Sequence, residues 1–573
     1  MVLEETPCEA GEVCNEPSDR CESAECSGNS DADGDGRDSL SCGGDDCDDD
    51  DASRYPGNSE VCDSAGHDED CVEDTYGDRD EDGDGFVDSA CCNGDRCGSD
   101  CDDSSSSISP TASESCNGVD DDCDDAVDET PGFPLCPGGA CVAGRCRLDA
   151  WDRTFGGSGR DLALDVAMDS RGNVYVVGGF ADAVRFGMTE ETASGMGDAF
   201  VLSLAGDGAY RWHQTFGGDE GDVARVVAVE DDEVFVAGYA TGTVDFGDGV
   251  PADLGGQRGF VVAFDNADGS HLWHADHGID VRALTVISDA VVAGGEFVST
   301  EDFGGGARSP TADVAGFIVR LSLAGVHRWD SVIDGNAGAS ISVRELASGG
   351  SRVFVAGVYD GSSLLLDGSS WPALGGVDLF VAGLEATDGT FDWGHAYADS
   401  GDTSASGLAW DVGGTLAVTG FYVGDFNLGT ERNTTTAAGV PEGYLLGLND
   451  SDGSYEWHHF LEGTGSFGTV DLVSAGGEFA LLGGLGAGMI DLGGGLRSTP
   501  GFAAIVARYR ADGTYGSDRE YESGGTSILL TGLATGLGGS TALTGGFTGS
   551  VDLGSGERVS AGDFDALVFR PER

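Results

Sequence analysis

The chain has 573 residues, enough for more than one domain, and contains 17 Cys and 98 Gly with a formal net charge of −75. It has no Lys, so all 28 basic side chains are arginines. A chain this acidic repels phosphate backbones, which excludes nucleic acid as a natural partner, and no apolar run approaches the length of a transmembrane segment.

All the cysteines lie between Cys8 and Cys146. This stretch is poor in Leu, Ile, Val and Phe and rich in Asp, Gly and Ser, so it cannot bury enough apolar surface to fold without disulfides or bound ions. Because disulfides persist only in oxidising compartments, we expect an extracytoplasmic protein, secreted or on the outer cell surface. Zinc is the alternative for clustered cysteines, but CxxC spacing with histidine partners is missing and His67 is the only histidine of the region.

The start of the sequence does not show how such a protein would be exported. Residues 1–8 have neither the basic nor the apolar segment of a leader peptide, so either the natural start lies upstream or a leader has been removed. The odd number of cysteines leaves one thiol that is free, paired between chains, or paired with a cysteine in a missing N-terminal stretch.

One unit occurs twice within the Cys-rich region. Residues 47–62 and 101–116 share the same spacings from Cys to Pro, from Pro to Glu and from Glu to Cys. The resulting organisation is a Cys-rich knob at 1–30, two Asp/Cys-rich repeats at 31–130, a second Cys-rich knob with a linker at 131–148, and a C-terminal domain at 149–573. We expect both knobs to be local disulfide loops.

Three loops in the Asp/Cys-rich repeats have the Asp-x-Asp-x-Asp spacing of calcium sites, in which alternate carboxylates converge on one cation as the backbone wraps around it. The candidate ligands are Asp80, Asp82, Asp84 and Asp88 in the best-matching loop, Asp31, Asp33 and Asp35 in a second, and Asp120, Asp122, Asp124 and Asp128 in a third. The second loop has Ser39 at the ninth position, and the third has Asp125 where the others have glycine.

None of the three loops has Glu at the twelfth position, so they are typical of thrombospondin or dockerin loops rather than helix-flanked EF-hands. Ligand sets made only of oxygen atoms favour Ca²⁺ over transition metals, so calcium is the expected cofactor. The alternative is a solvated acidic linker that binds no ion.

Residues 149–573 form a repeat array with a period of about 61 residues. A tryptophan marks each copy except the last, where Ser517 takes its place; these residues are Trp151, Trp212, Trp273, Trp329, Trp393 and Trp457. Each period carries four short runs rich in Val, Phe, Leu and Tyr, separated by Gly, Asp and Ser, without helical periodicity. The pattern predicts an all-β fold, a seven-bladed β-propeller of four-stranded blades. A parallel β-helix is the alternative, but its coils are shorter than this period.

The two ends of the array predict how the ring closes. It begins with a lone Trp strand at Trp151–Phe155 and ends at Asp565–Arg570 with the strand that normally precedes a Trp strand. Joining them completes one blade from both ends and removes the exposed sheet edges.

Both regions resemble known families. The motif Phe155-Gly-Gly-Ser-Gly-Arg-Asp, with Asp169-Ser-Arg-Gly-Asn173 and Asp198-Ala-Phe-Val after it, resembles the bacterial SBBP-type β-propeller repeat. That resemblance implies the fold and says little about function. Residues 116–129, Cys-Asn-Gly-Val-Asp-Asp-Asp-Cys-Asp-Asp-Ala-Val-Asp-Glu, resemble the MopE-type metal-binding motif of myxobacterial secreted proteins. In the first copy Val72 stands where a third carboxylate is expected, which weakens that loop as a metal site.

Other polar residues of the array favour structural roles. The Trp marker faintly resembles the docking motif of quinoprotein propellers, but no cofactor-binding set accompanies it, and no nucleophile–base motif is present. His213, His274 and His458 follow the Trp and are expected at the surface of the outermost strands. Turn-forming roles are expected for Asp161, Asp222 and Asp280, rather than a cation site at the channel mouth.

The sequence therefore predicts an exported, non-catalytic, calcium-binding surface or secreted protein whose propeller acts in recognition or as a scaffold. Its expected partners are Ca²⁺ and an unidentified protein or glycan ligand. One alternative is a propeller enzyme, a hydrolase, lyase or quinoprotein acting at the channel mouth. A second is a metal-scavenging protein of the outer surface.

Overall fold

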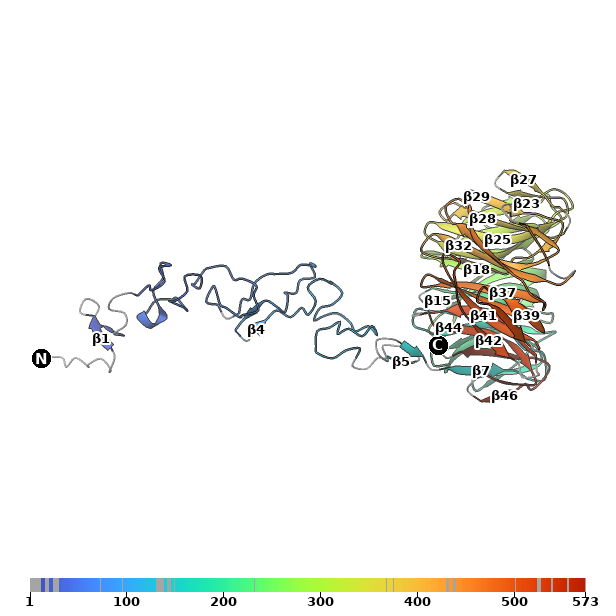
Figure 1. Ribbon diagram of the computed structural model, residues 1–573. Helices are drawn as coiled ribbons and strands as arrows, with labels where there is room; N and C mark the ends of the chain where they lie inside the picture. The colour runs from blue at the N-terminus through green and yellow to red at the C-terminus, as the bar shows by residue number, and fades with distance from the viewer. Residues whose placement is uncertain are drawn as a thin grey trace. The chain divides into compact units, whose positions relative to one another are not determined.

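The structure is a computed structural model (Figure 1). It describes residues 12–15, 20–23, 30–129, 139–141, 146–148 and 150–571, with gaps at 73, 95, 231, 367, 375, 429–431, 436–438, 500, 523–526, 537–538 and 554–555. The chain divides into two compact units, of which the first contains residues 1–136 and 140–147 and the second contains residues 137–139 and 148–573. Apart from one 3-10 turn, η2 (Leu40–Cys42), every regular element among the described residues is a strand, which confirms the all-β prediction.

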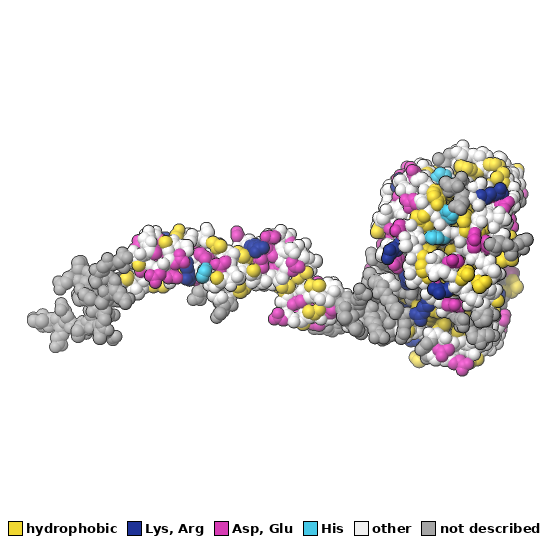
Figure 2. All heavy atoms as spheres, in the orientation of Figure 1, with side chains coloured by type: hydrophobic (Ala, Val, Ile, Leu, Met, Phe, Trp, Pro, Cys, Tyr) yellow, Lys and Arg dark blue, Asp and Glu magenta, His cyan; other side chains and the backbone are white. Residues whose placement is uncertain are grey.

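The N-terminal unit contains only short hairpins, which are β1 (Glu12–Asn15) with β2 (Arg20–Ser23), β3 (Cys92–Asn93) with β4 (Arg96–Cys97), and β5 (Gly139–Cys141) with β6 (Cys146–Leu148). Among its described residues, Cys91 is the only buried apolar side chain. Disulfides take the place of a core: every cysteine between residues 30 and 129 is disulfide-bonded. Figure 2 shows acidic side chains spread along this unit.

The disulfides follow the sequence repeat. Cys47–Cys71 in the first copy corresponds to Cys101–Cys123 in the second, and Cys62–Cys91 corresponds to Cys116–Cys141. A further bond, Cys92–Cys97, closes the β3–β4 hairpin. The last of the paired bonds corrects one prediction: Cys141 of the second knob bonds to Cys116 of the second repeat, so this knob is not a purely local loop. Most of the first knob lies outside the described residues.

The second unit is the predicted seven-bladed propeller, and each blade is an antiparallel sheet of four strands. Blades 1 to 3, from the innermost strand outward, are β8 (Leu162–Met168), β9 (Val174–Phe180), β12 (Asp198–Leu204) and β13 (Tyr210–Phe216); β14 (Val223–Glu230), β15 (Glu233–Val244), β16 (Ala252–Asp265) and β17 (His271–Asp276); and β18 (Asp280–Ile287), β19 (Ala290–Phe297), β22 (Ala315–Ser322) and β23 (His327–Gly335).

Blades 4 to 7 continue the same order. They are β24 (Ser340–Gly349), β25 (Arg352–Asp360), β28 (Asp378–Glu385) and β29 (Phe391–Tyr397); β30 (Asp402–Thr403) with β31 (Gly407–Trp410), β32 (Thr415–Val423), β35 (Glu442–Asn449) and β36 (Tyr455–Leu461); β37 (Phe467–Ala475), β38 (Glu478–Leu485), β41 (Ala503–Arg510) and β42 (Tyr515–Glu522); and β43 (Ser527–Thr535), β44 (Thr541–Thr548), β47 (Asp565–Arg570) and β7 (Trp151–Phe155). In blade 5 the innermost strand is split in two.

The ring closes as the sequence predicts. Strand β7 pairs antiparallel with β47, so that Phe155 lies opposite Ala566 and Trp151 opposite Arg570. The innermost strand of each blade contacts that of the next, and β43 contacts β8. The hydrophobic cores lie between blades: one cluster joins Tyr175 and Val201 of blade 1 to Val236 and Phe260 of blade 2.

A small hairpin between the second and third strands of most blades was not predicted. These hairpins are β10 (Ala183–Phe186) with β11 (Thr189–Thr192), β20 (Glu301–Asp302) with β21 (Ala307–Arg308), β26 (Ser363–Leu366) with β27 (Ser369–Pro372), β33 (Asp425–Asn427) with β34 (Arg432–Thr434), β39 (Gly488–Asp491) with β40 (Leu496–Thr499), and β45 (Ser550–Asp552) with β46 (Glu557–Val559). In blade 2, β15 and β16 themselves extend into this region.

The marker tryptophans dock each blade onto the next. Trp212 donates its Nε1–H to the carbonyl of Asn266, at the turn between the third and fourth strands of blade 2, at 2.8 Å. Gly269 of that turn lies against the indole with a φ of +75°, and a Cβ there would come within 2.5 Å of the ring. The same bond joins Trp151, Trp273, Trp329, Trp393 and Trp457 to the carbonyls of Gly206, Leu323, Ala386, Asp450 and Ala511.

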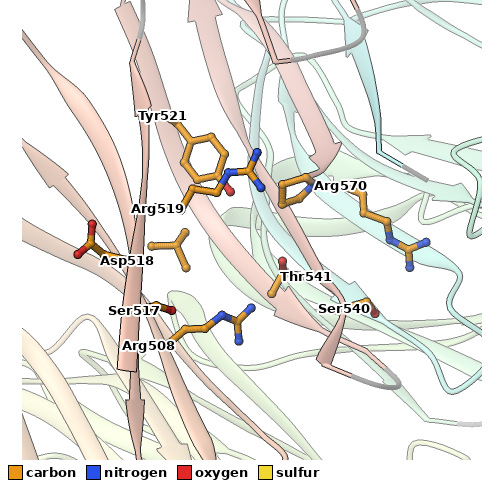
Figure 3. Close-up of a pocket in the computed structure, with 10 residues that line it drawn as sticks. Arg508, Ser517, Asp518, Arg519, Tyr521, Ser540, Thr541 and Arg570 are labelled. Carbon is orange, nitrogen blue, oxygen red and sulfur yellow. The ribbon is translucent and has the colours of Figure 1, made fainter. Parts of the chain in front are cut away.

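Ser517 occupies the equivalent position in blade 6, opposite Arg508 in the β41–β42 pair. The physical reason lies in the next blade: blade 7 has no turn between its third and fourth strands, because these are the two ends of the array. An indole there would have no turn to dock on. A cavity of about 200 Å³ remains at this seam, between Arg508 and Ser517 on one side and Ser540 and Thr541 on the other (Figure 3).

Candidate metal centres

The Asp80 loop wraps its own backbone around a set of carboxylates. Asp80 accepts the amides of Gly83 (2.7 Å) and Gly85 (3.2 Å), while Oδ1 of Asp82 accepts the amide of Asp84 at 3.1 Å. These bonds leave Oδ2 of Asp82 and Oδ2 of Asp84 buried without a hydrogen-bond partner. Buried carboxylate oxygens without a donor are costly unless a cation compensates them, so this loop has the form of a cation site.

A residue outside the loop completes the Asp80 site. Asp100 is fully buried, its Oδ1 accepts the amide of Asp102 at 2.9 Å, and its Oδ2 has no partner. Burial raises the pKa of Asp100, and the charges of Asp84 and Asp82 raise it further. The backbone bridge between Asp88 and Asp100 holds the two segments together.

The Asp31 loop repeats this arrangement. Asp31 accepts the amides of Gly34 and Gly36, and the unpaired buried oxygens are Oδ2 of Asp33, Asp35 and Asp46. One carboxylate oxygen from each of Asp31, Asp33 and Asp35 lies within 4.8 Å of the others. Burial raises the pKa of Asp33, with further contributions from the charges of Asp35, Asp46 and Asp31. Asp46 therefore plays the part that Asp100 plays in the Asp80 site.

The third loop has a different closing ligand. Asp120 accepts the amides of Asp124 and Asp125, Oδ1 of Asp122 has no partner, and neither has Oε2 of Glu129. Burial raises the pKa of Glu129, and Asp124, Glu114 and Asp122 contribute repulsion. The Glu114 carboxylate accepts hydrogen bonds from the backbone amides of Asp121, Asp122 and Asp128, so both of its oxygens already have partners.

Two predicted ligands are engaged elsewhere. Oδ1 of Asp88 accepts the amide of Ala90, and its Oδ2 pairs with Arg79 at 3.2 Å. Oδ1 of Asp128 accepts the amides of Asn117 and Gly118 at 2.8 Å, which closes that turn. The structure thus brings together Asp80, Asp82 and Asp84, Asp31, Asp33 and Asp35, and Asp120, Asp122 and Asp124, and places Asp88 and Asp128 in supporting contacts.

Asp46, Asp100 and Glu129 were missed from the sequence. A signal for the first two was present, because both stand immediately before the first Cys of a repeat, in the same Asp-Cys-Asp-Asp run. Asp46 and Asp100 are almost fully buried, and each has an oxygen without a hydrogen-bond partner.

The propeller residues singled out from the sequence have mostly structural contacts. Asp161 accepts the amides of Gly157 and Ala181, and Asp222 accepts those of Gly218 and Thr241, which confirms turn-forming roles for both. Asp280 instead pairs with Arg225 and Arg282.

The surface position expected for His213 is wrong. Its side chain is only 9% exposed, because it packs on Phe186 and contacts Glu191 and Tyr210. It does lie on the outermost strand of its blade, on the face opposite Trp212, as predicted.

The central channel holds a second group of carboxylates. A cavity of about 320 Å³ is lined by Asp165, Glu345 and Asp471 together with Arg225 and Arg282. Burial raises the pKa of Asp165 to about 6 and that of Asp471 to about 7, with repulsion from Asp165 adding to the latter; burial also raises the pKa of Glu345.

Two of these channel carboxylates form hydrogen bonds to the backbone of the neighbouring blade. Asp165 accepts the amide of Val227 in blade 2, at 2.9 Å. Asp471 accepts the amide of Leu533 in blade 7, at 2.7 Å. In each case a side chain of one innermost strand holds the backbone of the next, so the contact serves the ring itself.

Comparison with known proteins identifies the N-terminal motif. Residues 46–75 and 100–129 match the family model Cu-binding MopE, described as "Putative metal-binding motif". The first match begins at Asp46, and the second begins at Asp100 and ends at Glu129. Together they cover the two sequence repeats. They span less than half of the chain, so they identify a motif and not the family of the whole protein. No curated protein matches the chain. The likeness of the blades to SBBP-type repeats stays a prediction.

Solved structures similar to the chain include proteins of several kinds. BamB from Moraxella catarrhalis is 14% identical with a TM-score of 0.30, over 74% of this chain and 96% of that chain. Quinohemoprotein alcohol dehydrogenase from Comamonas testosteroni is 13% identical with a TM-score of 0.35, over 74% and 78%. Sqt1 from Saccharomyces cerevisiae is 10% identical with a TM-score of 0.31, over 74% and 99%. Likeness at this level carries no functional argument.

Among the described residues, no helix has the length and hydropathy needed to cross a membrane.

Proposed function

We propose that this is an exported calcium-binding protein in which calcium orders the N-terminal unit, while the propeller acts as a non-catalytic recognition or scaffold domain for a protein or glycan ligand. The observation that carries the proposal is the convergence of buried, unpaired carboxylate oxygens in the Asp31, Asp80 and Asp120 loops. Such oxygens need a cation, and a unit without an apolar core needs the folding energy that a bound cation supplies.

The donor chemistry favours Ca²⁺. The matching family model carries copper in its name, but the donors gathered in these three loops are carboxylates, and the cysteines between residues 30 and 129 are oxidised to disulfides and hold no thiolate. Carboxylate oxygens in a flexible wrapping loop are the ligands that Ca²⁺ prefers, whereas copper favours imidazole or thiolate. Extracytoplasmic location is supported by the same disulfides.

The test is metal content together with calcium-dependent protection from proteases. The purified full-length chain should retain three calcium ions, one per loop, after dialysis against a mixture of Ca²⁺ and Cu²⁺. Removing calcium with a chelator should expose residues 30–129 to protease while the propeller stays intact. Equal protection with and without chelator would contradict the proposal, and retention of copper in preference to calcium would favour a metal-scavenging protein instead.

An enzyme acting in the channel is the second candidate, because Asp165, Glu345 and Asp471 combine raised pKa values with two arginines in one cavity. The contacts of Asp165 and Asp471 with the next blade favour a structural role for these two. Glu345→Gln distinguishes the two candidates. If the propeller is a scaffold, the variant should capture its ligand as well as the parent does. If the channel is an active site, the variant should lose its catalytic activity.

A further inference from the structure

Two histidines meet on the outermost strand of blade 2. His271 and His274 are three residues apart on β17, a spacing that places side chains on opposite faces of a regular strand. Here Leu272 is bulged out: Phe264 lies opposite His271, Ala263 opposite Trp273, and Val262 opposite His274. The bulge therefore turns both imidazoles to the same face.

Their ring nitrogens face each other across a distance that fits two ligands of one metal ion. Nε2 of His271 and Nδ1 of His274 lie 3.0 Å apart. With metal–nitrogen bonds of about 2.0–2.1 Å, two nitrogens at this separation subtend about 94° at the metal. That angle is close to the right angle of octahedral or tetragonal coordination and well below the tetrahedral one.

A carboxylate stands beside the two nitrogens. Asp248 comes from the loop between β15 and β16, and one of its oxygens lies within 4.8 Å of a ring nitrogen of each histidine. The loop is held in place by Asp245, whose Oδ1 accepts the amides of Gly247 (2.9 Å) and Gly249 (3.0 Å). The third ligand, Asp248, therefore lies in a turn that hydrogen bonds hold in place.

The two rings are also held in position. His274 packs on the buried Phe246, with ring centroids 4.8 Å apart, and His271 meets Phe264 edge-on at 6.4 Å. Burial, followed by the neighbouring His274, lowers the pKa of His271.

We propose that His271, His274 and Asp248 form a transition-metal site on the rim of blade 2, selective for a late first-row divalent ion in octahedral or tetragonal geometry and distinct from the calcium loops. Imidazole nitrogens with one carboxylate are the donor set that Ni²⁺ and its neighbours prefer over Ca²⁺. Water supplies the remaining ligands.

The other blades provide matched controls, because the same bulge recurs with different residues. In blade 5 the pair is Tyr455 and His458, whose Oη and Nδ1 lie 2.8 Å apart, and in blade 3 it is His327 with Asp330. Only in blade 2 do two imidazoles occupy this pair among the described residues. A site made merely by one exposed histidine would appear in blade 5 as well.

The experiment titrates the full-length, untagged chain with Ni²⁺ in saturating Ca²⁺, followed by calorimetry and by the d–d spectrum of the same complex with Co²⁺. We expect one equivalent bound with a six-coordinate cobalt spectrum. His271→Gln and His274→Gln should each weaken that binding about tenfold or more, Asp248→Asn should weaken it less, and His458→Gln should leave it unchanged. Thermal unfolding of each variant checks that the propeller is intact.

Two results would overturn the site: binding of Ni²⁺ that survives both histidine substitutions, or the same loss in the blade 5 control. In either case the His271–His274 contact is an ordinary hydrogen bond between two imidazoles. Because calcium stays saturating throughout, failure here leaves the calcium proposal untouched.

Discussion

Asp100→Asn distinguishes a metal site from an acidic loop, because the expected effect on stability changes sign with calcium. The Asp100 carboxylate is fully buried, and the charges of Asp82 and Asp84 raise its pKa. Without a cation, replacing it with an amide removes repulsion, so the calcium-free N-terminal unit should become more stable. With calcium present, the same substitution removes a charged ligand and should destabilise the unit.

The size of the second effect follows from linkage. Calcium at 100 times its dissociation constant stabilises the unit by about 2.7 kcal/mol per site. If loss of one carboxylate weakens the Asp80 site about 100-fold, calcium at the same concentration stabilises the variant by only about 0.4 kcal/mol, a loss of about 2 kcal/mol. A tenfold weakening gives a loss of about 1.3 kcal/mol.

Pulse proteolysis in urea measures the stability of the N-terminal unit. Trp fluorescence cannot do so, because every tryptophan lies in the propeller. Calorimetry gives the calcium affinity of the same samples. Asp102→Asn is the control: it makes the same change in charge two residues away, at an exposed side chain that bonds to Ser104. If both variants behave alike, or if Asp100→Asn destabilises the calcium-free unit, the carboxylates do not form a cation site.

Three further predictions concern the propeller, each checked by thermal unfolding followed through Trp fluorescence. Trp212→Ala should cost about 3–5 kcal/mol, since it empties a buried interface and breaks the bond to Asn266, whereas Ser517→Ala should change stability by less than about 0.5 kcal/mol; similar effects would mean that the indoles do not dock the blades. The folded propeller holds the Asp471 proton to about pH 7, so its stability should fall by up to about 4 kcal/mol as pH rises from about 4 to about 7. Asp471→Asn leaves one oxygen for the amides of Leu472 and Leu533, a loss that is the same at every pH, but it removes this fall, so the stability of the variant relative to the parent should be greater at pH 8 than at pH 4; an equal difference at both pH values would contradict the raised pKa. A chain that begins at Gly157 should aggregate or melt well below one that begins at Ala150, because β47 loses its partner β7, and moving that strand to the C-terminus should restore stability.

The propeller could be predicted from sequence because its information is local and repeated. Turn residues recur in every repeat, every blade except the sixth carries a marker Trp, and the unequal ends at Trp151 and Arg570 reveal the closure. The small hairpins between the second and third strands of most blades were not predicted, because strands of two to four residues, such as Glu301–Asp302, are too short to show a periodic sequence pattern. The sequence shows that Ser517 replaces the marker Trp, but it does not show why. The folded ring explains the replacement, because blade 7 has no turn between its third and fourth strands on which an indole could dock.

The metal loops could be predicted only in part, for a related reason. The Asp-x-Asp-x-Asp spacing brings Asp80, Asp82 and Asp84 together within one turn of backbone. The closing ligand Asp100 comes from the next disulfide-bonded repeat, and the bridge between Asp88 and Asp100 that positions it is a tertiary contact. Asp88 had the right spacing, but Arg79 engages it instead.

Carboxylates do opposite work in the two units, and this difference decides how each depends on ions. In the propeller, Asp161, Asp222 and Asp471 each use both oxygens to accept backbone amides, which offsets part of the cost of their burial from within the fold. In the N-terminal unit, the buried oxygens of Asp82 and Asp100 have no donor, and no apolar core offsets the repulsion between them. Under the proposed function, a cation there supplies what hydrogen bonds and packing supply in the propeller. We therefore expect folding and ion binding to be one equilibrium in the N-terminal unit, whereas the propeller has its own apolar interfaces between blades.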